Sequence, residues 1–356
     1  MAKPDDGNES DRVLSTPPFA APEKRRVFTL AMFATLFALV LLAAPAIGPT
    51  HIDFSKVFDS HLPFADNVDA QILLITRLPR VFLAAITGAA LAVAGLVFQA
   101  ILGNPLATPY TLGIASGASL GAVISIRTGL VIVVFGVSSL VLSAFVGALL
   151  VMFFIYLLTR GTGGLAPATL LLAGVALNFL ATALMLFIHF LADFTESYQM
   201  LRWLMGGLDV TDYNLIASAG VMVALMLALM LTIARDLNLI SAGEELAFVR
   251  GVNVARTKKI AYFGASFMTA AVVSVSGPIG FVGLVIPHLL RLLVGSDNRV
   301  LMPASILFGA SFLIICDTLA RTIMSPLEIP AGVITAIIGS PFFIWLLLRE
   351  KGKIHA

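Results

Sequence analysis

The sequence predicts an all-α, polytopic membrane protein with about ten transmembrane helices. Hydrophobic residues make up 59% of the 356-residue chain and charged residues only 12%, whereas ordinary soluble domains carry about 25% charged residues. The apolar residues fall into long runs, and the run over residues 81–102 is long enough to cross about 30 Å of hydrocarbon. A multi-spanning membrane protein is the only class that fits both observations.

The chain is expected to start with a disordered cytoplasmic tail over residues 1–26. This segment is polar and rich in proline, so it cannot bury enough apolar surface to order itself. Arg25 and Arg26 directly precede the first apolar run, and basic residues beside a span favour its cytoplasmic end. We therefore expect the first span to enter the membrane from the cytoplasm.

Ten apolar segments are predicted to be spans. They cover residues 27–47, 81–102, 110–126, 131–158, 168–191, 213–233, 260–276, 281–294, 303–321 and 333–348. The membrane domain is therefore expected over residues 27–349, followed by a cytoplasmic tail over 350–356. Of the 22 lysines and arginines, this topology places 16 on the cytoplasmic side and six outside, in agreement with the positive-inside rule. We call the two ends of the molecule the predicted inner end and the predicted outer end.

The second and third spans, over residues 81–102 and 110–126, are separated by a break at Gly103-Asn104-Pro105. The third span is rich in glycine, alanine and serine. Small residues let helix backbones approach closely in a membrane, where packing replaces the hydrophobic effect. The sequence therefore predicts that these two spans form a tightly packed hairpin.

A long polar stretch between the sixth and seventh spans, residues 234–259, is expected to hold a cytoplasmic helix. Ser241 and Glu244 have the spacing of a capping box, and Gly251 suits a helix that ends at Arg250. This helix is either a connector lying on the membrane surface or a contact for a partner protein. An exposed Phe248 on so short a helix favours the partner.

Three segments resemble the permeases of type II ABC importers, which bring vitamin B12, iron siderophores or heme into bacteria. They are the stretch from Arg77 to Leu120, GFVGLVIPHLLRLL from Gly280, and EIPAGVITAIIGSPFFIWLL from Glu328. The resemblance implies the type II importer permease fold, in the bacterial inner membrane with both termini cytoplasmic. It also implies four kinds of partner: a second copy of this chain, two ATP-binding cassette subunits, a periplasmic substrate-binding protein and the lipid bilayer.

Three arginines are placed on the predicted outer side. Arg77 and Arg80 are three residues apart and are expected on one helix face, and Arg321 ends the ninth span. The resemblance implies that these arginines dock on glutamates of the binding protein, a task that suits the planar guanidinium group. For Arg321 an alternative stays open, because Asp317 lies four residues earlier and would pair with it. Arg77 and Arg80 have no acid at comparable spacing.

The resemblance also implies a coupling helix that fits a groove on the ATPase, where the family has a GEE segment followed by alanine and glycine. Together with the exposed phenylalanine, the predicted coupling residues are Gly243, Glu244, Glu245, Ala247, Phe248 and Gly251. Two cytoplasmic gates are expected by the same resemblance, at Asn104 with Leu106 and at Pro167 with Ala168. The first has a plain structural explanation as an Asn-Pro turn. At the second, the family often has small hydroxyl residues, whereas this chain reads Gly-Gly-Leu-Ala-Pro-Ala-Thr over residues 163–169.

Several kinds of chemistry are not expected of this chain. It lacks a GxxxxGK[ST] phosphate loop, so ATP and Mg²⁺ would be bound by the separate ATPase, and we predict no cofactor on this chain. No HExxH, GxSxG or paired-carboxylate site is present, which argues against a membrane enzyme. The histidines and Cys316 form no metal-ligating pattern, and the net charge of +2 does not favour nucleic acid.

These observations predict a permease subunit that moves an iron chelate from periplasm to cytoplasm by ATP-driven alternating access. Heme is favoured on overall resemblance alone, and siderophores or vitamin B12 remain open as cargo. An ion-coupled secondary transporter is the alternative of another class. Such a transporter would need buried acids partway across the membrane, and Asp317 is the one candidate among the predicted spans.

Overall fold

The computed structural model describes residues 23–59, 61–129, 132–134, 136–160 and 165–354. Most of the expected tail over residues 1–26 lies outside this range, and its last four residues belong to the first helix, α2 (Glu23–Ala43). The one sheet in the described residues is a hairpin of β1 (Val133–Val134) and β2 (Val137–Ser138). Everything else that is regular in this part of the chain is helical, so the all-α prediction is confirmed.

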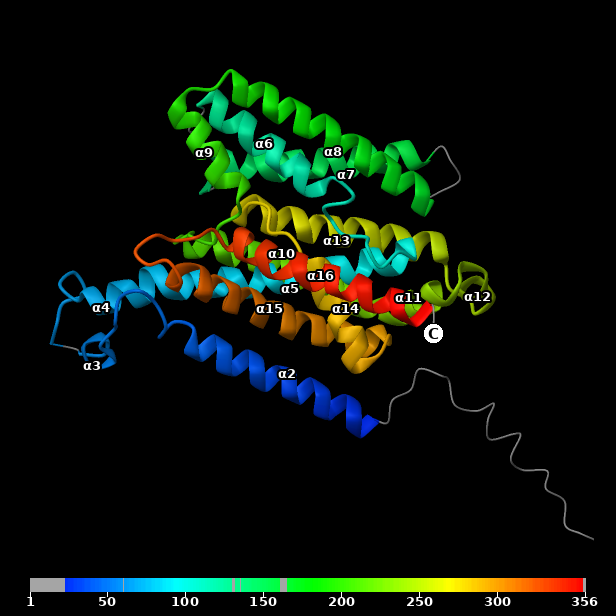
Figure 1. Cartoon of the computed structure of the whole chain (residues 1–356), viewed down its shortest axis with the longest axis horizontal. Coiled ribbons are helices and arrows are strands. Elements are labelled where there is room, and N and C mark those ends of the chain that lie inside the picture. The colour runs from blue at the N-terminus through cyan, green and yellow to red at the C-terminus, as the bar shows by residue number, and fades with distance from the viewer. Residues whose placement is uncertain (1–22, 60, 130–131, 135, 161–164, 355–356) are drawn as a thin grey trace, which may run out of the picture.

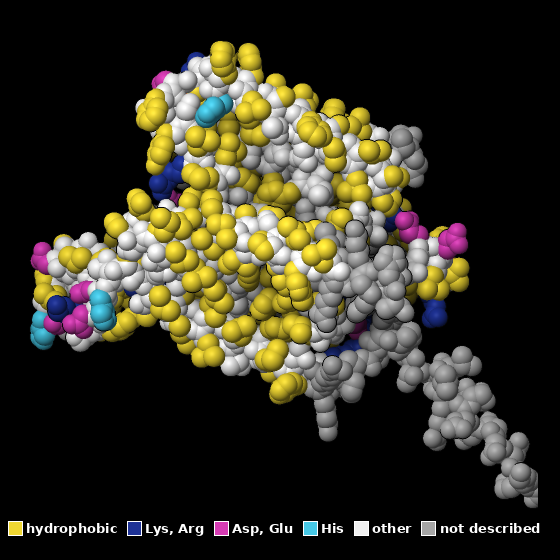
Figure 2. Space-filling view, in the orientation of Figure 1, with side chains coloured by type: hydrophobic (Ala, Val, Ile, Leu, Met, Phe, Trp, Pro, Cys, Tyr) yellow, Lys and Arg dark blue, Asp and Glu magenta, His cyan; other side chains and the backbone are white. Residues whose placement is uncertain are grey.

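Each of the ten predicted spans has a helix in the described chain. They are α2, α5 (Leu78–Leu102), α6 (Ile114–Thr128), α7 (Ser139–Arg160), α8 (Pro167–Phe190), α10 (Tyr213–Thr232), α13 (Val254–Ser276), α14 (Val282–Val294), α15 (Asn298–Thr322) and α16 (Ala331–Ile354). Seven helical runs in this part of the chain are long and apolar enough to cross a membrane, and three shorter helices are apolar as well. The fourth span begins later than predicted because the β hairpin occupies residues 133–138. Figure 2 shows the expected surface, with hydrophobic side chains over most of one face and charges gathered at both ends.

α5 is the central helix of the molecule. It packs against α13, α14 and α15, and most of its side chains are buried. A Cβ atom added to Gly95 would lie 1.9 Å from the carbonyl oxygen of Gly283, and one added to Gly88 would lie 2.2 Å from that of Gly309. Glycine at these positions therefore lets the backbones of α14 and α15 touch α5.

A second layer contains α6, α7, α8 and α9 (Phe194–Leu204) (Figure 1). α6 packs mainly against α7 and α8, whereas the neighbours of α5 are α13, α14 and α15. The predicted hairpin of α5 and α6 is therefore wrong. The small residues of α6 do pack closely, but against α7: a Cβ atom on Gly121 would lie 2.1 Å from the carbonyl oxygen of Ser143.

The polar loop over residues 234–259 forms two short helices before α13 begins. They are α11 (Ala234–Ala242) and α12 (Glu244–Val249). Gly243 separates them with a φ of 141°, a conformation that favours glycine, and it begins α12 without a side-chain cap. Ser241 lies inside α11, so the predicted capping box with Glu244 is wrong. The predicted end is right, because Arg250 is the C-cap and Gly251 follows it with a φ of 84°.

Short helices form the rest of the predicted outer end. α3 (Phe54–Val57), α4 (Val68–Gln71) and a π-helical turn, η1 (Ile72–Arg77), lead directly into α5. Arg77 and Arg80 therefore lie within one helical run rather than just ahead of a span that starts at residue 81.

Candidate functional site

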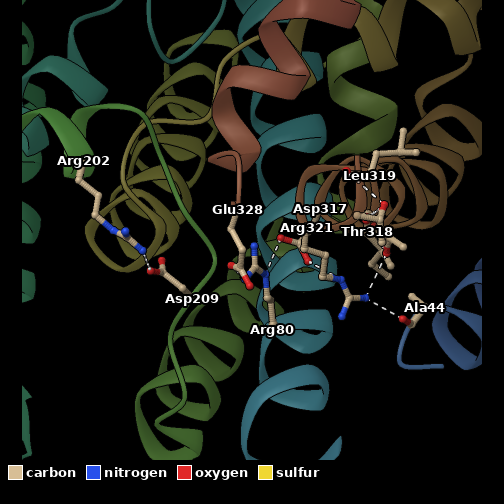
Figure 3. A network of polar contacts seen from close by, with 11 residues as sticks. Ala44, Arg80, Arg202, Asp209, Asp317, Thr318, Leu319, Arg321 and Glu328 are labelled. Carbon is tan, nitrogen blue, oxygen red and sulfur yellow. Dashed lines mark hydrogen bonds and ion pairs between the residues drawn. The ribbon is translucent and has the colours of Figure 1, made fainter. Parts of the chain in front are cut away.

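Arg80 is the centre of a polar network at the predicted outer end (Figure 3). Its Nε donates to Oδ1 of Asp317 at 2.8 Å, and its Nη1 donates to Oε2 of Glu328 at 2.6 Å. The side chains of Arg80 and Asp317 are 6% and 1% exposed, whereas that of Glu328 is 45% exposed. Arg80 thus joins one buried carboxylate to one that faces water.

Arg321 shares Asp317 with Arg80. Its Nε lies 3.8 Å from Oδ2 of Asp317, and its Nη2 donates to the backbone carbonyl of Ala44 at 2.6 Å. A distance of 3.8 Å is an ion pair but too long for a hydrogen bond, and both atoms are buried without a hydrogen-bond partner in the described chain. The alternative suggested by the i, i+4 spacing, that Asp317 pairs with Arg321, is therefore present in the structure.

Arg77 has a different environment. Its Nη1 donates to the carbonyl of Pro45 at 2.9 Å, and its Nη2 donates to the carbonyl of Thr50. Arg77 therefore holds the segment that follows α2 against η1. Arg77, Arg80 and Arg321 are all 3–5% exposed, so docking on a binding protein stays a prediction for them.

A cavity of about 550 Å³ opens beside Arg80 and Glu328, between the layer that holds α9 and the outer end of α13. Arg202 on α9 pairs with Asp209 on the same cavity wall, at 2.7 Å. Burial opposes ionisation of Asp209, but the hydrogen bond from Arg202, a backbone hydrogen bond and the positive charges of Arg202 and Arg80 together outweigh it. They hold the pKa of that carboxyl below its ordinary value. The sequence interpretation gave no role to Glu328 or Asp209. Arg80 has no acid at close spacing in the sequence, and this was the signal that an acid far along the chain pairs with it.

At the predicted inner end, the coupling residues of α12 have contrasting exposures. Ala247 is buried in a small core with Ile240, whereas Phe248 is 75% exposed. Glu244 accepts a hydrogen bond from Nζ of Lys258 at 2.5 Å, and the lysine side chain is only 7% exposed. The ion pair holds α12 against α13 while leaving an apolar side chain in water.

The predicted gates lie next to this polar loop. Glu244, Phe248 and Gly251 line a cavity of about 730 Å³ together with Pro167, the first residue of α8. A second cavity of about 630 Å³ is lined by α11 and by Asn104. The Oδ1 atom of Asn104 accepts a hydrogen bond from the backbone of Leu106 at 2.9 Å, as an Asn-Pro turn requires. Leu106 is 45% exposed, and Ala168 is exposed in the first turn of α8.

The sequence pattern of the FecCD transport family matches residues 35–349. The chain belongs to the FecCD transport family. It is therefore an ABC importer permease and a multi-pass membrane protein, and this family supports the importer class over the ion-coupled alternative. In the described residues, no group of histidine, cysteine and acidic side chains is placed to hold a metal ion.

Individual relatives are similar over most of their length. The hemin transport system permease protein HmuU of Yersinia pestis is 39% identical over 325 residues, which is 88% of this chain and 95% of that protein. The cobalamin import system permease protein BtuC of Halobacterium salinarum is 40% identical over 338 residues, or 92% and 90% of the two chains. A metal-chelate type ABC transporter solved in an inward-facing conformation has a TM-score of 0.78 and 29% identity, over 91% of this chain and 99% of that one.

Proposed function

We propose that this chain is the permease of a binding-protein-dependent importer that moves heme from the periplasm to the cytoplasm. It works as a homodimer in the bacterial inner membrane, with both termini cytoplasmic and with two copies of a separate ATPase that binds ATP and Mg²⁺. The support for heme is the likeness to a hemin permease and to a metal-chelate transporter. A cobalamin permease is equally similar, so cobalamin is the second candidate, with siderophores next.

One observation supports the coupling mechanism above all. Each gate segment shares a cavity with the polar loop over residues 234–259. Pro167 lines one cavity together with α12, and Asn104 lines another together with α11. A displacement of this loop therefore reaches both segments. We propose that the ATPase moves the loop and that the loop opens and closes the inner exit, which is alternating access driven from outside the chain.

The exposed surface of α12 fits this role. Phe248 and Val249 are 75% and 80% exposed on α12, which lies at the tip of the predicted inner end (Figure 1). Apolar side chains in this position are stabilised by a partner that buries them. The glutamates of α12 supply a polar rim around that apolar contact.

At the predicted outer end, we propose that the arginine cluster receives the binding protein. The cluster has three guanidinium groups, of Arg77, Arg80 and Arg321, against the two carboxylates of Asp317 and Glu328. Its excess positive charge favours an acidic partner. Arg80 is the member of the three that lines the outer cavity.

The decisive experiment reconstitutes the chain with its ATPase in liposomes and measures heme uptake and ATP hydrolysis. We expect Phe248→Asp to abolish association with the ATPase, because a carboxylate would enter the apolar contact. Phe64→Asp is the matched control. Phe64 is 50% exposed between α3 and α4 at the predicted outer end, so its substitution should leave association intact. Equal behaviour of the two variants would overturn the coupling role of α12.

The cargo is tested in the same liposomes with heme, cyanocobalamin and an iron siderophore in competition. Uptake of heme against an excess of the other two supports the proposed cargo. ATP-driven uptake of cobalamin instead would keep the importer function and replace the cargo. Uptake that needs no ATPase would overturn the importer proposal itself.

A further inference from the structure

We propose that Glu328 is an internal substitute for the binding protein's carboxylate, which it imitates at Arg80 until that protein docks. The inference rests on the proposed docking of a binding protein at the outer arginine cluster. It assigns a role to a residue for which the sequence suggested none.

The two acids that contact Arg80 are not equivalent. Asp317 lies on α15, is 1% exposed and is shared with Arg321, so it cannot leave without stranding two guanidinium groups. Glu328 is 45% exposed and has no other ion pair in the described residues. Asp317 is therefore the permanent counter-ion of Arg80, and Glu328 is the exchangeable one.

The geometry of the exchangeable contact leaves room for a better ligand. Glu328 reaches Arg80 through one bond, to Nη1, while Nη2 of Arg80 donates to no acceptor among the described residues. The two Nη atoms of a guanidinium group match the two oxygens of a carboxylate, and this bidentate arrangement is stronger than a single bond. A carboxylate that enters the outer cavity can take both Nη atoms and displace the single bond of Glu328.

The surroundings of Glu328 suit such an exchange. The next residue, Ile329, is fixed by a hydrogen bond from its backbone N–H to the carbonyl of Ala320 at 3.1 Å, so only the Glu328 side chain has to move. Ile323, Met324 and Leu327 in the preceding turn are 60%, 55% and 69% exposed. These side chains supply an apolar contact for a protein partner beside the charged one.

The test uses the permease–ATPase complex in nanodiscs. The probes are the chelate-binding proteins of the source organism, each purified with heme or cyanocobalamin bound. We expect Glu328→Gln to tighten docking about fivefold, because the competing charge is gone while the fold keeps Asp317. Glu196→Gln is the matched control, since Glu196 is another outer acid paired with an arginine, Arg127, at 3.1 Å. It should change docking less than twofold.

A double variant shows whether the gain passes through Arg80. Arg80→Lys keeps the positive charge but cannot offer two Nη atoms to one carboxylate, so docking should weaken. In this background, adding Glu328→Gln should not tighten docking. Melting temperatures identify any variant that fails to fold. If Glu328→Gln weakens docking or behaves as Glu196→Gln does, the substitute role is overturned while docking stands. If no probe docks on the unaltered complex, the proposed docking function itself fails.

Discussion

The two ends of this permease differ in how their functional side chains are exposed to solvent. At the predicted outer end the arginines lie inside the fold, where Arg80 and Arg321 share the buried carboxylate of Asp317. At the predicted inner end α12 leaves Phe248 and Val249 exposed. Most charges of the outer cluster are therefore paired within the chain, whereas the inner end leaves apolar side chains exposed for the proposed ATPase. Substitutions at the outer end should act first on stability, and those at the inner end first on coupling.

The largest effect on stability is expected from Asp317→Asn at the outer end. Without this carboxylate, two buried guanidinium groups keep only Glu328 as a nearby counter-ion. Removing one partner of a buried ion pair costs about 3–5 kcal/mol. The free energy of unfolding in detergent should fall by this amount. Ser311→Ala, at another buried position of the same helix, is the control, and an equal loss in both variants would contradict the central role of Asp317.

The ion pair at the inner end should respond asymmetrically. Glu244→Ala leaves the buried Lys258 without its acceptor and should cost about 1–3 kcal/mol, because a buried donor then stays unpaired. Lys258→Met leaves Glu244, which is 54% exposed and can turn to water, and should cost less than about 1 kcal/mol. Both should lower the uptake of cargo per ATP hydrolysed. Equal stability losses would mean that the lysine is less buried than the structure places it.

The stability of the inner end should depend on pH through Asp297. This carboxylate accepts a hydrogen bond from Arg299 at 2.9 Å and forms an ion pair with Arg26 at 3.0 Å. Burial opposes ionisation of Asp297, but hydrogen bonds from Arg299 and Asn238 outweigh it and hold the pKa below its ordinary value. The stabilisation is therefore complete above an unfolded pKa of about 3.9 and is lost as pH falls through the lower folded pKa. Melting temperature from pH 7 to pH 2.5 measures it. Asp297→Asn should lower the melting temperature at pH 7. The difference in melting temperature between this variant and the unaltered chain should become smaller at acid pH.

The smallest effect is expected at the exposed outer pair of Arg202 and Asp209. Their side chains are 58% and 50% exposed, so water and salt screen the attraction. Arg202→Gln should change the free energy of unfolding by less than about 1 kcal/mol. A larger loss, measured by the same unfolding experiment, would show that this pair holds α9 in place.

Some features of the fold can be predicted from the sequence and others cannot. The ten spans follow from apolar runs, because hydrocarbon thickness sets the length of a helix. The break after residue 242 does not follow from the same pattern: Ser241 and Glu244 fit a capping box, but Gly243 ends α11 between them. The capping box does not form because Gly243 adopts a backbone conformation that ends α11 and starts α12.

The outer cluster was only half predictable for a different reason. The i, i+4 spacing of Asp317 and Arg321 is local and visible in the sequence. The contact of Arg80 with Asp317 joins residues 237 positions apart, and it exists because α5 packs against α15. The same packing, which no single segment specifies, placed α6 against α7 and made the predicted α5–α6 hairpin wrong.

The glycine contacts of α5 have a mechanical consequence. Backbone touches backbone at Gly95 with Gly283 and at Gly88 with Gly309, so α5, α14 and α15 cannot slide past one another without a clash. We therefore predict that these three helices move as one block during transport and that the layer of α6 to α9 moves relative to them. Spin labels on α14 and α15 should therefore keep their separation throughout ATP turnover, while labels on α8 and α15 change theirs.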